Sequence, residues 1–163
     1  MTPVSEAARL IDQFKRAHAG HPWHGSPLTA ILRGVTASQA ATKPPKGGHS
    51  IWELVLHITN WRNEVAARAT GQPAGLPAAG NWPRIGNPTP ARWKAALAAL
   101  GASHRNLVKV VRDMSDERLL EPTNDPRSRR GTGVSYYELL HGIVQHDAYH
   151  AGQIAILKKV LGF

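Results

Sequence analysis

The chain has 163 residues, of which 42% are hydrophobic and 19% are charged, a composition typical of a folded domain rather than a disordered segment. It contains no cysteine, which excludes structural disulfides, thiolate metal ligands and a cysteine nucleophile. The net charge of +9 favours anionic partners. However, the arginines are scattered and no nucleic-acid-binding motif accompanies them, so nucleic acid is not expected to be the main partner.

The sequence shows no pattern of export or membrane insertion. Residues 1–14 lack the basic stretch followed by an apolar run that marks a signal peptide. No apolar stretch approaches the ~18 residues that a membrane-spanning helix requires. We therefore expect a soluble, cytoplasmic protein with no membrane partner.

Apolar residues at helical spacing predict a first amphipathic helix over residues 4–18. A short helix is expected over residues 27–34, because Ser26 suits the N-cap and Pro27 suits the first helical position. The prolines and glycines of residues 43–48 then predict a loop.

Ser50 and Glu53 form a capping box, in which each side chain bonds the backbone amide of the other residue. This box predicts a helix of about twenty residues that ends near Gly71. Residues 71–90 contain five prolines and four glycines, which predict a long loop. A loop of this length inside a compact domain is often functional.

Thr89 followed by Pro90 predicts the start of another long helix, which continues to about Asp113. Its inward positions carry leucine, valine and tryptophan at steps of three and four. Residues 115–120 are expected to add a short turn of helix.

A polar, basic loop is expected over residues 121–134, and a second capping box at Ser135 and Glu138 opens a last helix that runs to about Leu161. Four long helices without any strand pattern predict an all-α fold. We expect a four-helix bundle that forms one domain over residues 1–163, with long loops that permit crossover connections.

Nine histidines are many for this length, and three of them stand at positions that should face the core. His146 and His150 are four residues apart, which places them on one face of the last helix. That face also carries Ile143 and Ile154, so the histidines interrupt an apolar stripe. His57 interrupts the apolar stripe of the helix that follows Ser50 in the same way.

Buried imidazoles without partners are costly, and a single divalent metal ion would satisfy all three. We therefore predict a metal site made by His57, His146 and His150, with zinc or nickel as the ion. Three protein ligands leave coordination positions free, as in catalytic sites. The alternative is that these are core histidines bonded to the backbone or to each other. Glu53 could supply a fourth ligand, although helix capping is its simpler role.

The sequence HDAYH at residues 146–150 is superficially similar to the zinc-protease motif HExxH. We reject a protease because Asp147 is one carbon shorter than the required glutamate. The candidates for a general base are Glu53, Asp147, Tyr149 and Gln153. Asp147 lies about 100° around the helix from His146, so we expect it to point away. Gln153 should lie near the site, but an amide is not a base.

Two irregular segments are expected to form the rim of a pocket over the metal. One is the loop 71–90, and the other is the segment that carries four aromatic or imidazole side chains. Those side chains are His18, His21, Trp23 and His24. The alternative is that the histidines of this segment are ordinary surface groups.

Two segments resemble signatures of the DinB-like superfamily: GGHSIWELVLHITNWRNEVAARATG at residues 47–71 and HGIVQHDAYHAGQIAILKKV at residues 141–160. The order of helices, the proline-rich loop with NWP and the final histidine pair match as well. By this resemblance, His57 corresponds to the first family ligand, and His146 and His150 to the second and third. It implies a four-helix bundle, commonly dimeric, that binds zinc or nickel.

Some members of that family are enzymes that use bacillithiol, mycothiol or glutathione in transfers and isomerisations. The resemblance therefore implies a metal-dependent enzyme that activates a low-molecular-weight thiol or water, acting as a transferase or hydrolase on a small molecule. The alternative is a non-enzymatic metal- or ligand-binding stress-response protein. The missing cysteine fits the first hypothesis, because the thiol would then come from outside the chain.

The tryptophans suggest an interface between copies of the chain. Trp23, Trp52, Trp82 and Trp93 exceed what one small core needs, and exposed aromatic surface is enriched at interfaces. We therefore expect a homodimer. The alternative is that these side chains pack beneath the long loops.

Overall fold

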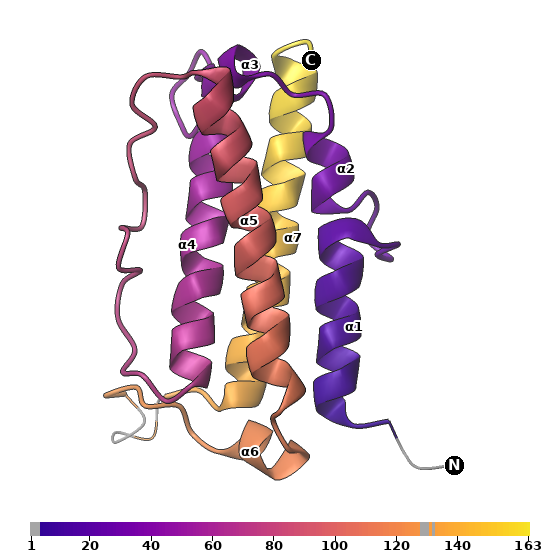
Figure 1. Ribbon diagram of the computed structural model, residues 1–163, viewed down its shortest axis with the longest axis vertical. Helices are drawn as coiled ribbons and strands as arrows, with labels where there is room; N and C mark the ends of the chain where they lie inside the picture. Colours follow the sequence, from indigo (N-terminus) through magenta and orange to yellow (C-terminus); the bar gives the residue numbers. More distant parts are fainter. Residues whose placement is uncertain (1–3, 128–130, 132) are drawn as a thin grey trace.

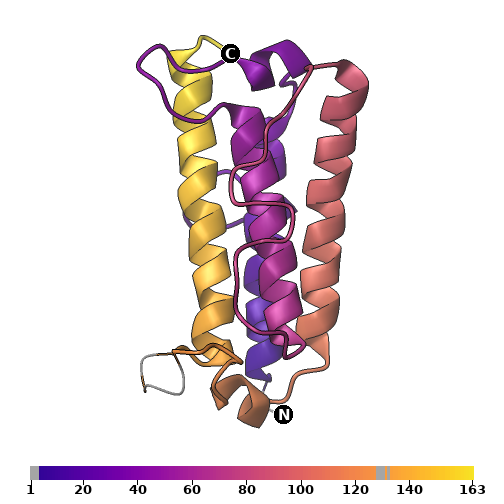
Figure 2. The same ribbon diagram turned by 90° about the vertical axis from the view of Figure 1, so that its left-hand side faces the viewer.

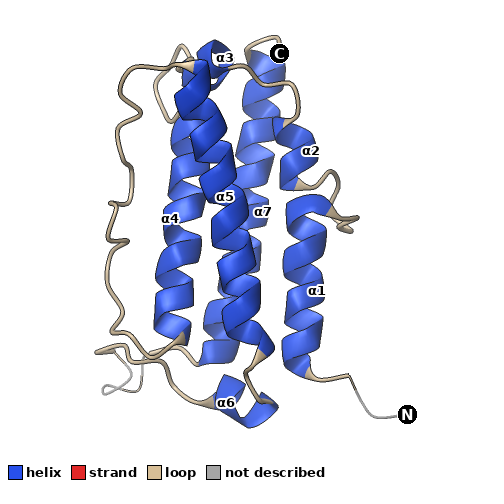
Figure 3. Cartoon of the chain, in the orientation of Figure 1, coloured by secondary structure: helices blue, strands red, loops and turns tan. Residues whose placement is uncertain are grey.

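The computed structural model describes residues 4–127, 131 and 133–163, and within them every regular element is a helix (Figure 3). This confirms the predicted all-α class. The helices are α1 (Glu6–Ala19), α2 (Leu28–Leu32), α3 (Ala37–Ala41), α4 (Ile51–Ala69), α5 (Pro90–Arg112), α6 (Asp116–Leu120) and α7 (Tyr136–Val160). Residues 128–130 and 132 of the predicted loop 121–134 lie outside the described residues.

The two predicted capping boxes open α4 and α7. The Ser50 hydroxyl accepts a hydrogen bond from the Glu53 amide at 3.3 Å, and the Glu53 carboxylate accepts one from the Ser50 amide at 2.8 Å. Ser135 and Glu138 make the same pair of bonds at 3.2 and 2.7 Å. Such caps satisfy amides that have no partner inside the helix, which fixes the residue where each helix begins.

The first connection differs from the prediction in two places. Pro27, not Ser26, is the N-cap of α2, and no side chain caps this helix. The unpredicted α3 begins with a further capping box, between Thr36 and Gln39. A helix of five residues contains little more than one turn, so it carries no apolar periodicity that a sequence pattern would reveal.

The four long helices α1, α4, α5 and α7 lie side by side (Figures 1 and 2). Both α1 and α4 pack against α5 and against α7. The segment between α4 and α5 returns along the length of α4, so these two helices run in the same direction (Figure 2). This is a crossover connection of the kind that each of the two long predicted loops, 71–90 and 121–134, would permit. The connection from α5 to α7 is not a crossover, because α5 ends and α7 begins at the same end of the molecule, beside α6.

Two apolar clusters occupy the two halves of the core. One cluster includes Trp52, Leu54, Ile58, Leu100 and Ile154. The other includes Leu10, Phe14, Val65, Leu107 and Ile143. Along α4, α5 and α7, buried polar residues stand between the members of one cluster and the members of the other. The core therefore carries a polar layer at mid-height.

None of the described helices combines the length and the apolar character needed to cross a membrane.

Candidate metal centre

The polar layer brings together the three histidines that the sequence predicts as ligands. His57 extends from α4, and His146 and His150 extend from consecutive turns of α7. One ring nitrogen of each lies within 4.8 Å of the other two. His57 and His150 are buried, and His146 is half-buried. The packing of α4 against α7 therefore creates the convergence that the two helical stripes predicted.

Hydrogen bonds at the outer nitrogens fix which nitrogen faces the centre. His57 Nδ1 lies 2.8 Å from the Asn81 carbonyl oxygen, which only accepts, so Nδ1 must carry the proton. His150 Nδ1 donates in the same way to the amide oxygen of Gln153 at 2.8 Å. The Nε2 atoms of both rings are therefore left with lone pairs directed inward. Such bonds at the outer nitrogen are typical of metal-ligating histidines.

The spacing of these nitrogens suits a single ion. His57 Nε2 and His146 Nε2 are 3.0 Å apart. Zinc binds imidazole at about 2.0–2.1 Å, which separates two ligands of a tetrahedral site by about 3.3 Å. A small movement of either ring would therefore accommodate the metal.

A neutral imidazole is the form that binds metal, and burial favours this form at His57 and His150. Burial, together with the charges of the neighbouring His150 and His146, lowers the pKa of His57 to about 4. Burial also lowers the pKa of His150. Because a proton competes with a metal ion for the same lone pair, these lowered pKa values favour metal binding near neutral pH.

The proline-rich connection between α4 and α5 is held over His57. The Asn60 amide donates to the Gly80 carbonyl, and the Trp61 indole donates to the Asn81 side chain, both at 2.8 Å. These bonds place the Trp82 ring flat against His57, with ring centres 3.8 Å apart. His49 stacks on the opposite face of the same indole at 3.4 Å.

The histidines open onto a cavity of about 450 Å³. Trp82 and Tyr149 stand at its walls, with Asn81 and Gln153. The predicted rim 71–90 is therefore present through Asn81 and Trp82. The tripeptide NWP was visible in the sequence, but the hydrogen bonds that hold it over His57 were not.

A family model described as the DinB superfamily matches residues 23–154. The chain belongs to the DinB superfamily. The matched region contains α2 to α6, all three candidate ligands and the tryptophan-bearing loop. Neither the curated proteins nor the solved structures that were compared with this DinB-superfamily chain gave a match.

The prediction of a second rim for the cavity, from the segment between α1 and α2, is wrong. His18, His21, Trp23 and His24 are all absent from the lining of the cavity. His18 is instead buried in the core, where its ring stacks on His104 at 4.1 Å. The backbone of α1 lies against α5 and α7 and not against α4, which carries His57.

The candidate bases occupy different environments. Tyr149 and Gln153 line the cavity, and Tyr149 is exposed. Glu53 does not line it and is held by Lys43 at 2.8 Å and by the Ser50 amide. Burial alone would raise the pKa of Glu53, but these bonds lower it below its usual value. Glu53 is therefore an ionised helix cap, as its simpler role predicted, and lies outside the three-histidine group.

Asp147 points away from the cavity, as predicted, but it is not on the surface. Its Oδ2 accepts a hydrogen bond at 2.8 Å from the buried Arg62 guanidinium of α4. Its Oδ1 lies 3.8 Å from His146 Nδ1, and neither of these buried atoms has a hydrogen-bond partner among the described residues. A small rotation of the His146 ring would close this gap, so Asp147 is placed to orient His146 from behind.

Proposed function

We propose that His57, His146 and His150 bind one divalent metal ion, zinc or nickel, at the centre of a four-helix bundle. The convergence of one ring nitrogen from each histidine, with inward-facing lone pairs on His57 and His150, carries the proposal. Three converging imidazole nitrogens are a typical ligand set for a divalent metal ion, and imidazole suits both zinc and nickel. Asn81 and Gln153 hold the rings of His57 and His150 from outside, and Trp82 fixes the plane of His57.

We further propose that the centre activates a low-molecular-weight thiol or water for a transfer or hydrolysis reaction on a small molecule. Three neutral ligands leave the full charge of a divalent ion in place, which lowers the pKa of a bound thiol or water toward neutrality. The cavity in front of the histidines gives a small molecule access to that position. Tyr149 at its wall is the hydroxyl that would meet the reactants.

The second candidate is a metal- or ligand-binding protein without catalytic activity. One observation favours it: no carboxylate lines the cavity among the described residues, so a conventional general base is missing there. A thiol that loses its proton on binding metal needs no strong base. Hydrolysis depends more on a general base, because the attacking water must also lose a proton. A thiol-dependent reaction is therefore the better form of the enzyme hypothesis.

Elemental analysis tests the metal. Protein purified without a metal-affinity column is expected to hold close to one equivalent of zinc or nickel. His57→Ala, His146→Ala and His150→Ala should each lose most of that metal while helical circular dichroism persists. His141→Ala is a matched control, because His141 is also on α7 but lies outside the three-histidine group. A ligand variant that holds metal as tightly as the parent would remove that residue from the site.

A screen for thiol transfer separates the two candidate functions. Small thiols would be tested against monochlorobimane with metal-loaded, chelated and reloaded protein. The enzyme hypothesis expects a rate that disappears on chelation and returns with metal. Equal rates for loaded and chelated protein, with every thiol and for plain hydrolysis, would favour the binding protein.

A further inference from the structure

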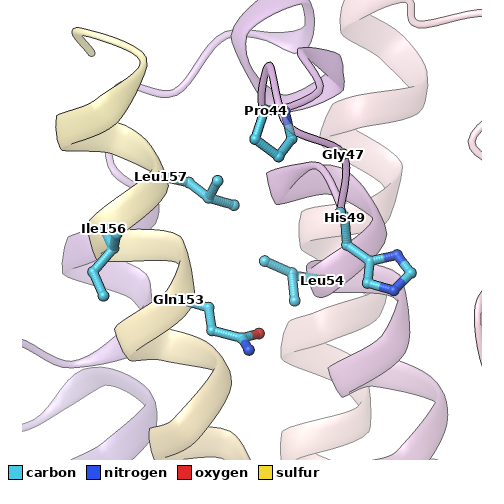
Figure 4. Close-up of a pocket in the computed structure, with 8 residues that line it drawn as sticks. Pro44, Gly47, His49, Leu54, Gln153, Ile156 and Leu157 are labelled. Atoms are coloured by element: carbon cyan, nitrogen blue, oxygen red, sulfur yellow. The ribbon is translucent and has the colours of Figure 1, made fainter.

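A second pocket adjoins the metal cavity. It measures about 380 Å³ and lies between α7 and the segment that leads into α4 (Figure 4). His49 and Gln153 line both this pocket and the metal cavity, so the two form a continuous cleft. The second pocket continues from Gln153 along α7 toward Ile156 and Leu157, away from the histidines.

Apart from His49 and Gln153, which it shares with the metal cavity, the lining of the second pocket is apolar. Leu157 extends from α7 toward Leu54 of α4, and Pro44 stands above them (Figure 4). No lysine, arginine, aspartate or glutamate is among the lining residues in the described part of the chain. The nearby carboxylate of Glu53 is neutralised by Lys43 at 2.8 Å. A charged group placed here would lose its hydration without gaining a partner, whereas a hydrocarbon group would gain from leaving water.

Gln153 marks the junction between the two pockets. Its amide oxygen is occupied by His150 Nδ1 at 2.8 Å. Its amide nitrogen has no acceptor among the described residues, so it is available to donate to a ligand. The cleft therefore presents, in order, a metal-binding centre, one hydrogen-bond donor and an apolar chamber.

Resting on the proposed metal centre, we propose that this pocket holds the apolar arm of the ligand whose polar head reaches the metal. The ligand class is an uncharged or singly ionised small molecule with a metal-binding head, such as a thiol or a hydroxamate, joined to an aliphatic or aromatic arm. Each pocket is within the range of about 300–1,000 Å³ that small-molecule sites occupy. Continuity with the metal centre identifies the occupant as part of the same ligand.

The test uses linear alkyl hydroxamates from acetohydroxamate to octanohydroxamate, titrated calorimetrically into the zinc-loaded full chain. The short hydroxamate reports on the metal alone. Each added methylene that enters the pocket should tighten binding by up to about fourfold, until the pocket is filled. The matching alkyl amides, which lack the N-hydroxyl oxygen and so cannot chelate the metal, should bind far more weakly at every length.

Ile156→Glu places a charge at the mouth of the second pocket. Ile156 is 63% exposed, so the substitution should leave the fold intact. It should weaken octanohydroxamate at least tenfold and leave acetohydroxamate unchanged. Val160→Glu is the matched control, because Val160 is one turn later on α7, is 64% exposed and lines neither pocket. It should change neither affinity.

The outcomes separate the two proposals. If acetohydroxamate does not bind the zinc-loaded protein, the proposed metal centre fails and the apolar subsite fails with it. If acetohydroxamate binds but affinity does not rise with chain length, only the subsite is overturned. The same conclusion follows if Ile156→Glu weakens octanohydroxamate no more than Val160→Glu does.

Discussion

Replacing Asp147 with leucine is expected to destabilise the protein strongly, although Asp147 is not a candidate ligand. The side chains of Arg62 and Asp147 are 2% and 8% exposed, and their Nε–Oδ2 distance is 2.8 Å. In Asp147→Leu, the guanidinium would stay buried with two weak contacts at 3.4 Å, to His18 Nδ1 and the Leu100 carbonyl. The charge would then have no counterion in the polar layer.

The expected cost follows from the burial of the pair. Removing one partner of a buried ion pair typically costs about 3–5 kcal/mol. For a chain of this length, each kcal/mol lowers the melting temperature by about 2–4 °C, so a fall of roughly 6–20 °C is expected. The double variant Arg62→Met with Asp147→Leu removes both charges and should recover much of the loss. The cost of the double variant should therefore be well below the sum of the two single costs.

Urea denaturation, followed by circular dichroism, would measure the free energy of unfolding of each variant. The protein should be kept metal-free with a chelator, because Asp147 adjoins the candidate ligand His146 and its replacement would also change metal binding. Asp12→Leu is the matched control, since Asp12 pairs with Arg16 on the surface, where the side chains are 51% and 49% exposed. Its cost should stay below about 1 kcal/mol. If the single costs at Arg62 and Asp147 are additive in the double variant, the two charges are not coupled and the reasoning is wrong.

Three further predictions concern the site, the core and the assembly. Trp82→Ala should weaken metal binding about 10–100-fold in competition with a chelator, and unchanged affinity would show that the indole does not orient His57. Burial and the charge of Arg62 lower the pKa of His18 to about 3 and that of His104 to about 4. Unfolding therefore takes up protons below pH ~6.5, so the free energy of unfolding of the metal-free protein should be highest above that pH and decline toward pH 4. A flat profile would contradict this. His104→Gln should make the decline with falling pH less steep. Sedimentation at micromolar concentration is expected to show a homodimer, and a species of only 17.7 kDa would refute it.

The long helices were predictable because their ends carry local chemical signals. Ser50, Thr89 and Ser135 each accept a hydrogen bond from the backbone three residues later, and each marks the start of a helix. Thr36 carries the same signal, but the helix it opens is too short for a repeating apolar pattern to support it. Local capping therefore located the helices wherever periodicity extended over several turns.

The positions of the tryptophans could not be predicted from their number. Trp52 and Trp93 contact each other in the core with ring centres 5.1 Å apart, and the Trp93 indole donates to the Val35 carbonyl. Trp82 stacks between two imidazoles, and Trp23 is fully exposed. Of these four tryptophans, Trp23 offers the largest exposed surface to the predicted dimer interface. The count of aromatic residues thus overstated the exposed aromatic area.

The three histidines were predictable as a group, because helical spacing places them on two stripes that face each other. The support around them was not. Asn81 and Trp82 belong to a connection without regular structure, and their positions depend on hydrogen bonds to Asn60 and Trp61 on a different element. No periodic pattern encodes such contacts, so the path of the loop over His57 followed only from the structure.

Asp147 shows where helical geometry gives the right angle and an incomplete conclusion. A rotation of about 100° per residue does move its side chain off the face that carries His146. The Asp147 side chain would reach solvent only if other helices packed against a single face of α7. However, α7 packs against α1, α2 and α4, so it has more than one interior face. A buried carboxylate on that second interior face requires a hydrogen-bond partner, and Arg62 of α4, five residues after His57, supplies it. An acidic residue between two ligand positions of an enclosed helix is therefore evidence for a basic residue on a neighbouring helix.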